Sequence, residues 1–134
     1  MRFVETLGSY LPALIVRQLQ GPPETQHVPR REGLDTVCLF ADIKGFTALS
    51  EAMEEEGAGS EGLAKYLNMY FSQMCRIIAS EGGDVFKYAG DAMIVLWEVK
   101  GGDEGATMEM QARRATQCAV ALQSYLHSAT LDVE

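Results

Sequence analysis

The sequence has little positive charge and no long apolar run. Acidic residues outnumber basic ones 19 to 11 among 134 residues, which gives a formal charge of -8. Nucleic acids and anionic membranes bind clusters of Lys and Arg, so this balance argues against both as partners. No apolar run approaches the ~20 residues of a membrane span, and the N-terminus lacks a secretory signal pattern. A nucleotide is still allowed, because a metal ion can bring phosphates to an acidic site.

Cysteine is scarce as well. Cys38, Cys75 and Cys118 are odd in number and far apart, and each lies in an apolar strand or helix pattern. This spacing matches neither a disulfide framework nor a zinc motif. We therefore expect buried, reduced thiols in a cytoplasmic protein. The length of 134 residues and the hydrophobic content of 47% suit one domain, or part of one, with a packed core.

The most informative stretch is residues 40–47, Phe-Ala-Asp-Ile-Lys-Gly-Phe-Thr. It begins within an apolar run, residues 37–41, that predicts a strand buried on both faces. Asp42 follows this strand directly, and Gly45 turns the chain into a helical pattern. A carboxylate at the end of a central strand lies at the rim of the sheet, where open α/β-type sheets place ligands.

A second stretch, residues 82–97, predicts a hairpin. Two short apolar runs flank Ala89-Gly90, and Asp91 comes just past the tip. If the first strand lies beside this hairpin, Asp42 and Asp91 meet at one edge and form an oxygen-rich Mg²⁺ site with room for substrate phosphates. Lys87, on the other side of the tip, can face the same end of the sheet.

Taken singly, each of these residues has a plainer interpretation. Asp42 is also suited to cap the following helix. Asp91 is also a common turn residue, and Lys87 would serve as an exposed cation. The combination is more specific than its parts.

The other patterns place both stretches in an α+β fold with an antiparallel strand pair. We expect an N-terminal helical segment and connector over residues 1–33, broken at Pro12, and the main domain over residues 34–134. Within the main domain the predicted elements are a strand at 36–42, helices at 46–55, 63–79 and 108–127, a hairpin at 85–98, loops at 54–62 and 101–105, and a truncated strand at 131–134.

Residues 40–47 and 82–92 together resemble the catalytic domain of class III nucleotidyl cyclases. Residues 11–16 and Leu96-Trp97 are more closely similar to the first catalytic domain of soluble, bicarbonate-responsive adenylyl cyclases. The resemblance implies a ferredoxin-like nucleotidyl cyclase fold, truncated after the hairpin and the following helix. It also implies a partner, a second cyclase catalytic domain in cis or in trans, with active sites in the cleft between the two.

The resemblance further implies a reaction and the residues that carry it. ATP would be converted to cyclic AMP and pyrophosphate. The catalytic residues would be Asp42 and Asp91, which would hold two Mg²⁺ or Mn²⁺ ions together with the backbone carbonyl of Ile43. The phosphates would be bound at the start of the following helix, by Gly45, Phe46 and Thr47.

Lys87 has two implied roles. It would contact the adenine base across the domain pair, or it would help to hold bicarbonate in a degenerate second site. A glutamate here would instead have suggested guanine.

The sequence contains no Asn-x-x-x-Arg, the family's transition-state pair. We therefore expect the N-terminal part of a longer, cytoplasmic cyclase. The alternative is a catalytically silent structural or regulatory module in a larger assembly, such as a ciliary one. A polymerase-type two-metal site would explain the aspartates, but not their sequence context.

Overall fold

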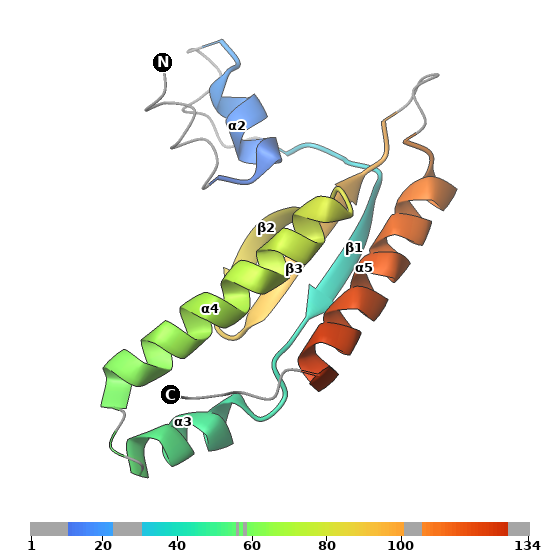
Figure 1. Cartoon of the computed structure of the whole chain (residues 1–134). Coiled ribbons are helices and arrows are strands. Elements are labelled where there is room, and N and C mark those ends of the chain that lie inside the picture. The colour runs from blue at the N-terminus through green and yellow to red at the C-terminus, as the bar shows by residue number, and fades with distance from the viewer. Residues whose placement is uncertain (1–10, 23–30, 56, 58, 101–105, 129–134) are drawn as a thin grey trace.

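The chain forms a small antiparallel sheet with helices on both of its faces (Figure 1). The computed structural model describes residues 11–22, 31–55, 57, 59–100 and 106–128. The elements, in chain order, are α2 (Ala13–Leu19), β1 (Thr36–Ala41), α3 (Phe46–Glu55), α4 (Gly59–Ser80), β2 (Asp84–Ala89), β3 (Ala92–Glu98) and α5 (Met108–Ser128). The predicted α+β class is confirmed.

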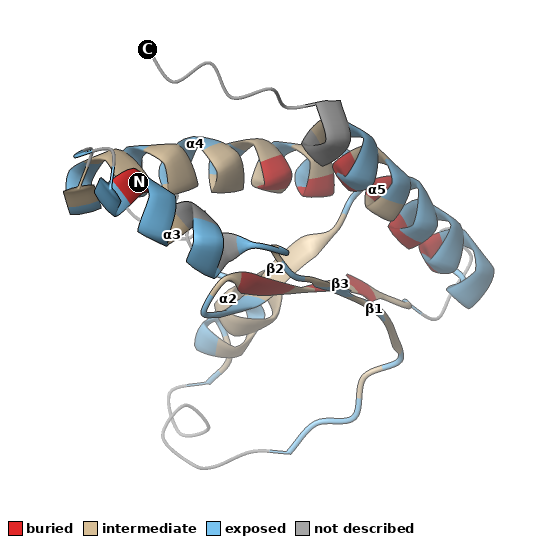
Figure 2. Cartoon of the chain, turned by 90° about the horizontal axis from the view of Figure 1, so that it is seen from below, coloured by how far each residue is buried: buried red, intermediate tan, exposed pale blue. Residues whose placement is uncertain are grey.

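The strands lie in the order β1-β3-β2, and both neighbouring pairs are antiparallel. Helices α4 and α5 cover one face of this sheet, whereas α2 lies on the other side (Figure 2). Side chains alternate along a strand, so Met93, Val95 and Trp97 of the central strand all point toward α4 and α5. All three are buried, with exposed fractions of 0%, 0% and 1%.

The core forms where the two long helices meet β3. Its buried members are Met74, Ile78, Met93, Val95, Trp97, Ala115, Cys118 and Leu122. The Trp97 indole N–H donates a hydrogen bond to the backbone oxygen of Glu81 at 2.9 Å, which satisfies the one polar atom of this side chain. The same contact ties the end of α4 to the central strand.

The first strand differs from its prediction. Within the part of the chain that the structure describes, β1 lies at the edge of the sheet. One of its faces packs against the core, through Val37, Leu39 and Ala41. On the other face Cys38 is exposed and Phe40 is 61% exposed. The expectation of a central strand buried on both faces was wrong, because an apolar run does not reveal which of its faces a helix covers. The expectation of buried thiols holds for Cys118, whereas Cys75 is half-buried and Cys38 is exposed.

The boundaries of three helices are informative. Helix α3 has the predicted bounds, and α2 begins directly after Pro12. Helix α4 begins at Gly59, so the predicted loop over residues 54–62 is wrong for its second half. An acidic first-turn residue, Glu61, suits the positive end of the helix dipole and pairs with Lys65 at 3.1 Å.

The predicted loop at 101–105, the strand at 131–134 and the first part of the N-terminal segment lie outside the described residues. Among the helices that are described, none has the length and hydropathy that a membrane crossing requires.

Candidate functional site

Asp42 and Asp91 lie at the same end of the sheet. The last pair of the β1–β3 ladder joins Ala41 to Met93. Asp42 comes one residue after Ala41, and Asp91 comes two residues before Met93. Continuing the ladder by one pair sets Asp42 opposite Ala92, the neighbour of Asp91. The condition set by the sequence, that the first strand lies beside the hairpin, is therefore met.

Asp91 occupies the turn itself. Ala89 pairs with Ala92, so the loop of the hairpin consists of Gly90 and Asp91 alone. The sequence interpretation had set Asp91 just past a tip at Ala89-Gly90, which is one residue out of register. Gly90 has φ +67°, the positive value that a type II′ turn requires at its first central position. Because the loop is so short, the position of Asp91 is fixed by the ladder on either side of it.

Lys87 lies on the sheet face opposite α4 and α5. It pairs with Ile94, which in turn pairs with Phe40, so these three side chains form a row across the sheet. Lys87 is exposed, Phe40 is largely exposed and Ile94 is half-buried. This row combines an apolar surface with one cation, next to the edge that carries Asp42 and Asp91.

The predicted phosphate-binding residues lead into α3. Gly45 has φ +89° and belongs to the turn before the helix, which Phe46 begins. The first four N–H groups of a helix have no partner within the helix. No acidic residue lies in the first turn of α3, so no side-chain charge there opposes an anion. Thr47 is exposed in this turn.

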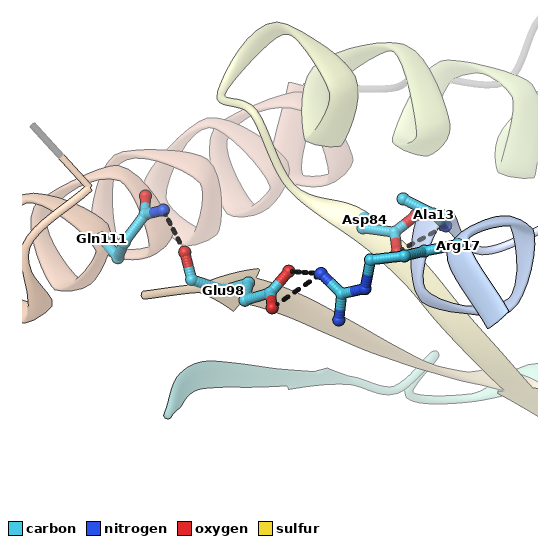
Figure 3. A network of polar contacts seen from close by, with 5 residues as sticks. All are labelled: Ala13, Arg17, Asp84, Glu98 and Gln111. Atoms are coloured by element: carbon cyan, nitrogen blue, oxygen red, sulfur yellow. Dashed lines mark hydrogen bonds and ion pairs between the residues drawn. The ribbon is translucent and has the colours of Figure 1, made fainter. Parts of the chain in front are cut away.

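The other end of the sheet is held by a polar network that the sequence did not predict (Figure 3). The Asp84 carboxylate accepts a hydrogen bond from the backbone N–H of Ala13 at 2.9 Å, which caps α2 from a position distant in sequence. Arg17 donates to both carboxylate oxygens of Glu98, at 2.9 and 2.8 Å. On the far side of the strand, Gln111 of α5 donates to the Glu98 backbone oxygen at 2.7 Å.

This network explains why Asp84, although it lies in the second motif, is not part of the candidate site. It pairs with Leu96, toward the opposite end of β3 from Asp91. The sequence predicted a helical segment at α2 from its helical pattern. The partners of α2 could not be read from it.

The oxygen donors at the end of the sheet that carries Asp42 and Asp91 suit a hard divalent cation. Within the described parts of the chain, no group of three or more His, Cys, Asp or Glu side chains could enclose a metal ion. Two carboxylates and a backbone carbonyl are a typical protein contribution to Mg²⁺, which retains water and phosphate oxygens as its other ligands. The residues present therefore fit Mg²⁺ or Mn²⁺ bound together with a phosphorylated substrate.

Two groups outside the candidate site have strongly raised pKa values. Burial and a hydrogen bond with Cys75 raise the pKa of the Tyr88 phenol to about 12. Burial, with a smaller effect of Glu81, raises the pKa of the Cys118 thiol to about 11. Both groups are therefore neutral at physiological pH, and Cys118 is an inert core thiol.

Residues 30–133 match the family described as the adenylate and guanylate cyclase catalytic domain. Adenylate cyclase type 10 from Oryctolagus cuniculus is 35% identical over 102 residues, which is 74% of this chain and 6% of that protein. An adenylate cyclase from Anabaena cylindrica is 40% identical over 60 residues, 45% of this chain and 11% of that protein. The chain thus spans a small part of the length of the relatives it matches.

Solved structures agree with this similarity. The adenylyl cyclase CyaB from P. aeruginosa is 28% identical with a TM-score of 0.54, over 70% of this chain and 46% of that one. The guanylyl cyclase Cya2 is 31% identical with a TM-score of 0.53, over 72% and 45%. A bacterial light-regulated adenylyl cyclase, 24% identical, has a TM-score of 0.70 over 99% of this chain and 34% of that one, a likeness of fold.

Proposed function

Because the chain belongs to the adenylate and guanylate cyclase catalytic domain family, we propose that it supplies the metal-binding part of an adenylate cyclase active site. The active site converts ATP to cyclic AMP and pyrophosphate in the cytoplasm, and a second cyclase domain, in cis or in trans, completes it. The observation that carries this proposal is the β1–β3 register, which brings Asp42 and Asp91 to one end of the sheet.

In this proposal Asp42, Asp91 and the Ile43 carbonyl would hold two Mg²⁺ or Mn²⁺ ions. When bound, such ions would lower the pKa of the ribose 3′-hydroxyl and balance the charge of the triphosphate. The backbone N–H groups of Gly45, Phe46 and Thr47 bind phosphate oxygens at the start of α3. The reaction forms the bond from the 3′-oxygen to the α-phosphorus and breaks the bond to pyrophosphate, while the hydroxyl proton is released. The chain's own contribution is positioning and charge stabilisation.

The choice of ATP rests on Lys87 and on the relatives. The relatives matched in sequence are adenylate cyclases, whereas one of the similar structures is a guanylyl cyclase. Lys87 can donate hydrogen bonds but cannot accept them, which suits the N1 edge of adenine, where the ring nitrogen is an acceptor; the same nitrogen of guanine carries a hydrogen and is a donor. The exposed Phe40 in the same row offers a surface for a planar base. In a degenerate second site the same cation would instead bind bicarbonate.

The first experiment measures cyclic nucleotide production by the native-length polypeptide with Mn²⁺ and either ATP or GTP. We expect cyclic AMP from ATP, and a fall of more than about a hundredfold in Asp42→Asn and Asp91→Asn, because metal-held charge contributes several kcal/mol to the transition state. Glu51→Gln is the matched control, since it removes an exposed carboxylate from α3.

The outcomes separate the candidates. Cyclic AMP that is lost in both aspartate variants and kept in Glu51→Gln supports the proposal. Cyclic GMP alone would identify a guanylate cyclase. No product from a folded, native-length protein would contradict enzymatic function and favour a silent module retained for assembly.

A further inference from the structure

Strand β2 contains a bulge beside the candidate site. Val85 pairs with Val95, but the next pair joins Lys87 to Ile94, so Phe86 is an extra residue in the ladder. In a regular strand Lys87 would share the face of Val85, because side chains alternate with a period of two. The bulge moves Lys87 to the face away from the helices. It also turns Tyr88, which pairs with the buried Met93, toward α4.

Tyr88 makes two contacts with α4. Its ring meets Phe71 edge to face, with centroids 5.8 Å apart and an interplanar angle of 87°. Its hydroxyl lies 3.2 Å from the Cys75 sulfur, within hydrogen-bonding distance. Aromatic pairs prefer particular arrangements of the two rings, so this contact restricts the orientation of Tyr88 more than an ordinary apolar contact would. Tyr88 is 51% exposed, so these contacts, rather than enclosure on all sides, hold its side chain.

The helix that receives Tyr88 is itself fixed in the core. Phe71 and Cys75 each lie three residues before a buried core residue, Met74 and Ile78 respectively. Residues three apart are neighbours on a helix surface, so the two contacts rest on an anchored face of α4. Nearer the loop, Ala89 is exposed, and a Cβ at Gly90 would meet nothing within 4 Å apart from its two chain neighbours. The hairpin end is therefore open around Tyr88.

We propose that Tyr88 is a positioning residue, which through Phe71 and Cys75 fixes the bulged end of β2 so that Lys87 is presented to the base or anion bound at the site. Tyr88 does not touch the ligand, because it points to the opposite face of the sheet from Lys87. The identity of the ligand in this inference rests on the proposed function. The ordering of the hairpin end by Tyr88 is independent of that function.

The kinetic test is a double-mutant cycle in the native-length polypeptide. Tyr88→Phe keeps the contact with Phe71 and removes the hydroxyl, so we expect KM for ATP to rise about two- to tenfold with kcat nearly unchanged, as for loss of one hydrogen bond. In a Lys87→Ala background the same substitution should have no effect, so the double variant should have the same KM as Lys87→Ala alone. A merely structural role would lower the active fraction, and therefore kcat, equally in both backgrounds.

Cys75 supplies the matched pair of variants. Cys75→Ser keeps a hydrogen-bonding group and should retain the wild-type KM, whereas Cys75→Ala should reproduce Tyr88→Phe. Tyr66→Phe is the control for loss of a tyrosine hydroxyl, because the Tyr66 ring stacks on Tyr70 within α4, with centroids 6.4 Å apart. Equal effects of Tyr88→Phe with and without Lys87 would overturn the proposal.

A second readout does not depend on activity. Amide hydrogen exchange over residues 87–92 should accelerate several-fold in Tyr88→Phe and Cys75→Ala, and not in Tyr66→Phe. If the protein makes no cyclic nucleotide, the proposed function fails. If Lys87→Ala leaves KM unchanged, the role of Lys87 fails. In either case the exchange measurement still tests whether Tyr88 orders the hairpin end. Unchanged exchange in Tyr88→Phe would overturn the inference.

Discussion

At the scale of single residues, the pKa of the Tyr88 phenol reflects the groups that surround it. Burial disfavours the phenolate, and the hydrogen bond with Cys75 favours the neutral form, so its pKa rises from 10.0 to about 12. The folded state therefore holds this proton more tightly than the unfolded state. Its contribution to stability is fully present below pH 10 and is lost as the pH rises toward 12, since unfolded chains release the proton first.

The resulting prediction compares wild type with Tyr88→Phe. The free energy of unfolding should differ between the two by a constant amount below pH 10, and the advantage of wild type should shrink as the pH rises from 10 to 12. Denaturant titrations at several pH values measure this difference directly. A difference that stays constant to pH 12 would show that the phenol is not held in its neutral form.

At the scale of elements, the connection between α4 and β2 requires the backbone at Gly83 to pass close to the side chains of Trp97 and Ile78. Gly82 has φ +71°, and the Gly83 N–H bonds to the Ile78 oxygen at 2.9 Å, an arrangement that ends the helix. A Cβ at Gly83 would lie 2.6 Å from the Trp97 ring and 2.9 Å from an Ile78 methyl group. Neither neighbour can move easily, because both are buried in the core.

We therefore expect Gly83→Ala to lower the free energy of unfolding by about 1–3 kcal/mol, the usual effect of overpacking a core. Gly33→Ala is the matched control, since a Cβ there meets nothing within 4 Å and its stability should change little. Equal stabilities of the two variants in denaturant titrations would contradict the packing described for Trp97.

The sequence predicted elements better than it predicted their surroundings. Helix α3 and the two strands of the hairpin follow from local patterns of turn residues and apolar spacing, whereas the pairing of β1 with β3 was only a condition of the predicted site. The open face of β1 does not, because Phe40 and Cys38 are as apolar as their buried neighbours. The bulge at Phe86 has no composition signal, and the cap that Asp84 gives to Ala13 joins residues 71 positions apart. The metal-binding role of Asp42 and Asp91 came from their places in the sequence and from the family resemblance, and the role of Lys87 came from the resemblance. All three roles stay predictions.

At the scale of the whole molecule, one end of the sheet is covered by a helix and the other end carries exposed side chains. Helix α2 is bound to one end through Asp84 and Glu98. At the other end the same face carries the exposed Phe40 and Lys87, next to Asp42 and Asp91. The overall charge of -8 opposes binding of a free anion, so a nucleotide bound at this end needs cations to accompany it.

The most direct test of this account is a Mn²⁺ titration of the isotope-labelled chain, followed by nuclear magnetic resonance. If Asp42 and Asp91 share a metal site, substoichiometric Mn²⁺ should broaden the amide signals of residues 42–44 and 90–92 together. Asp42→Asn should abolish the broadening at both segments, and Glu51→Gln should leave it intact. Broadening confined to one segment, or centred on the glutamates of α3, would contradict a shared site at the edge of the sheet.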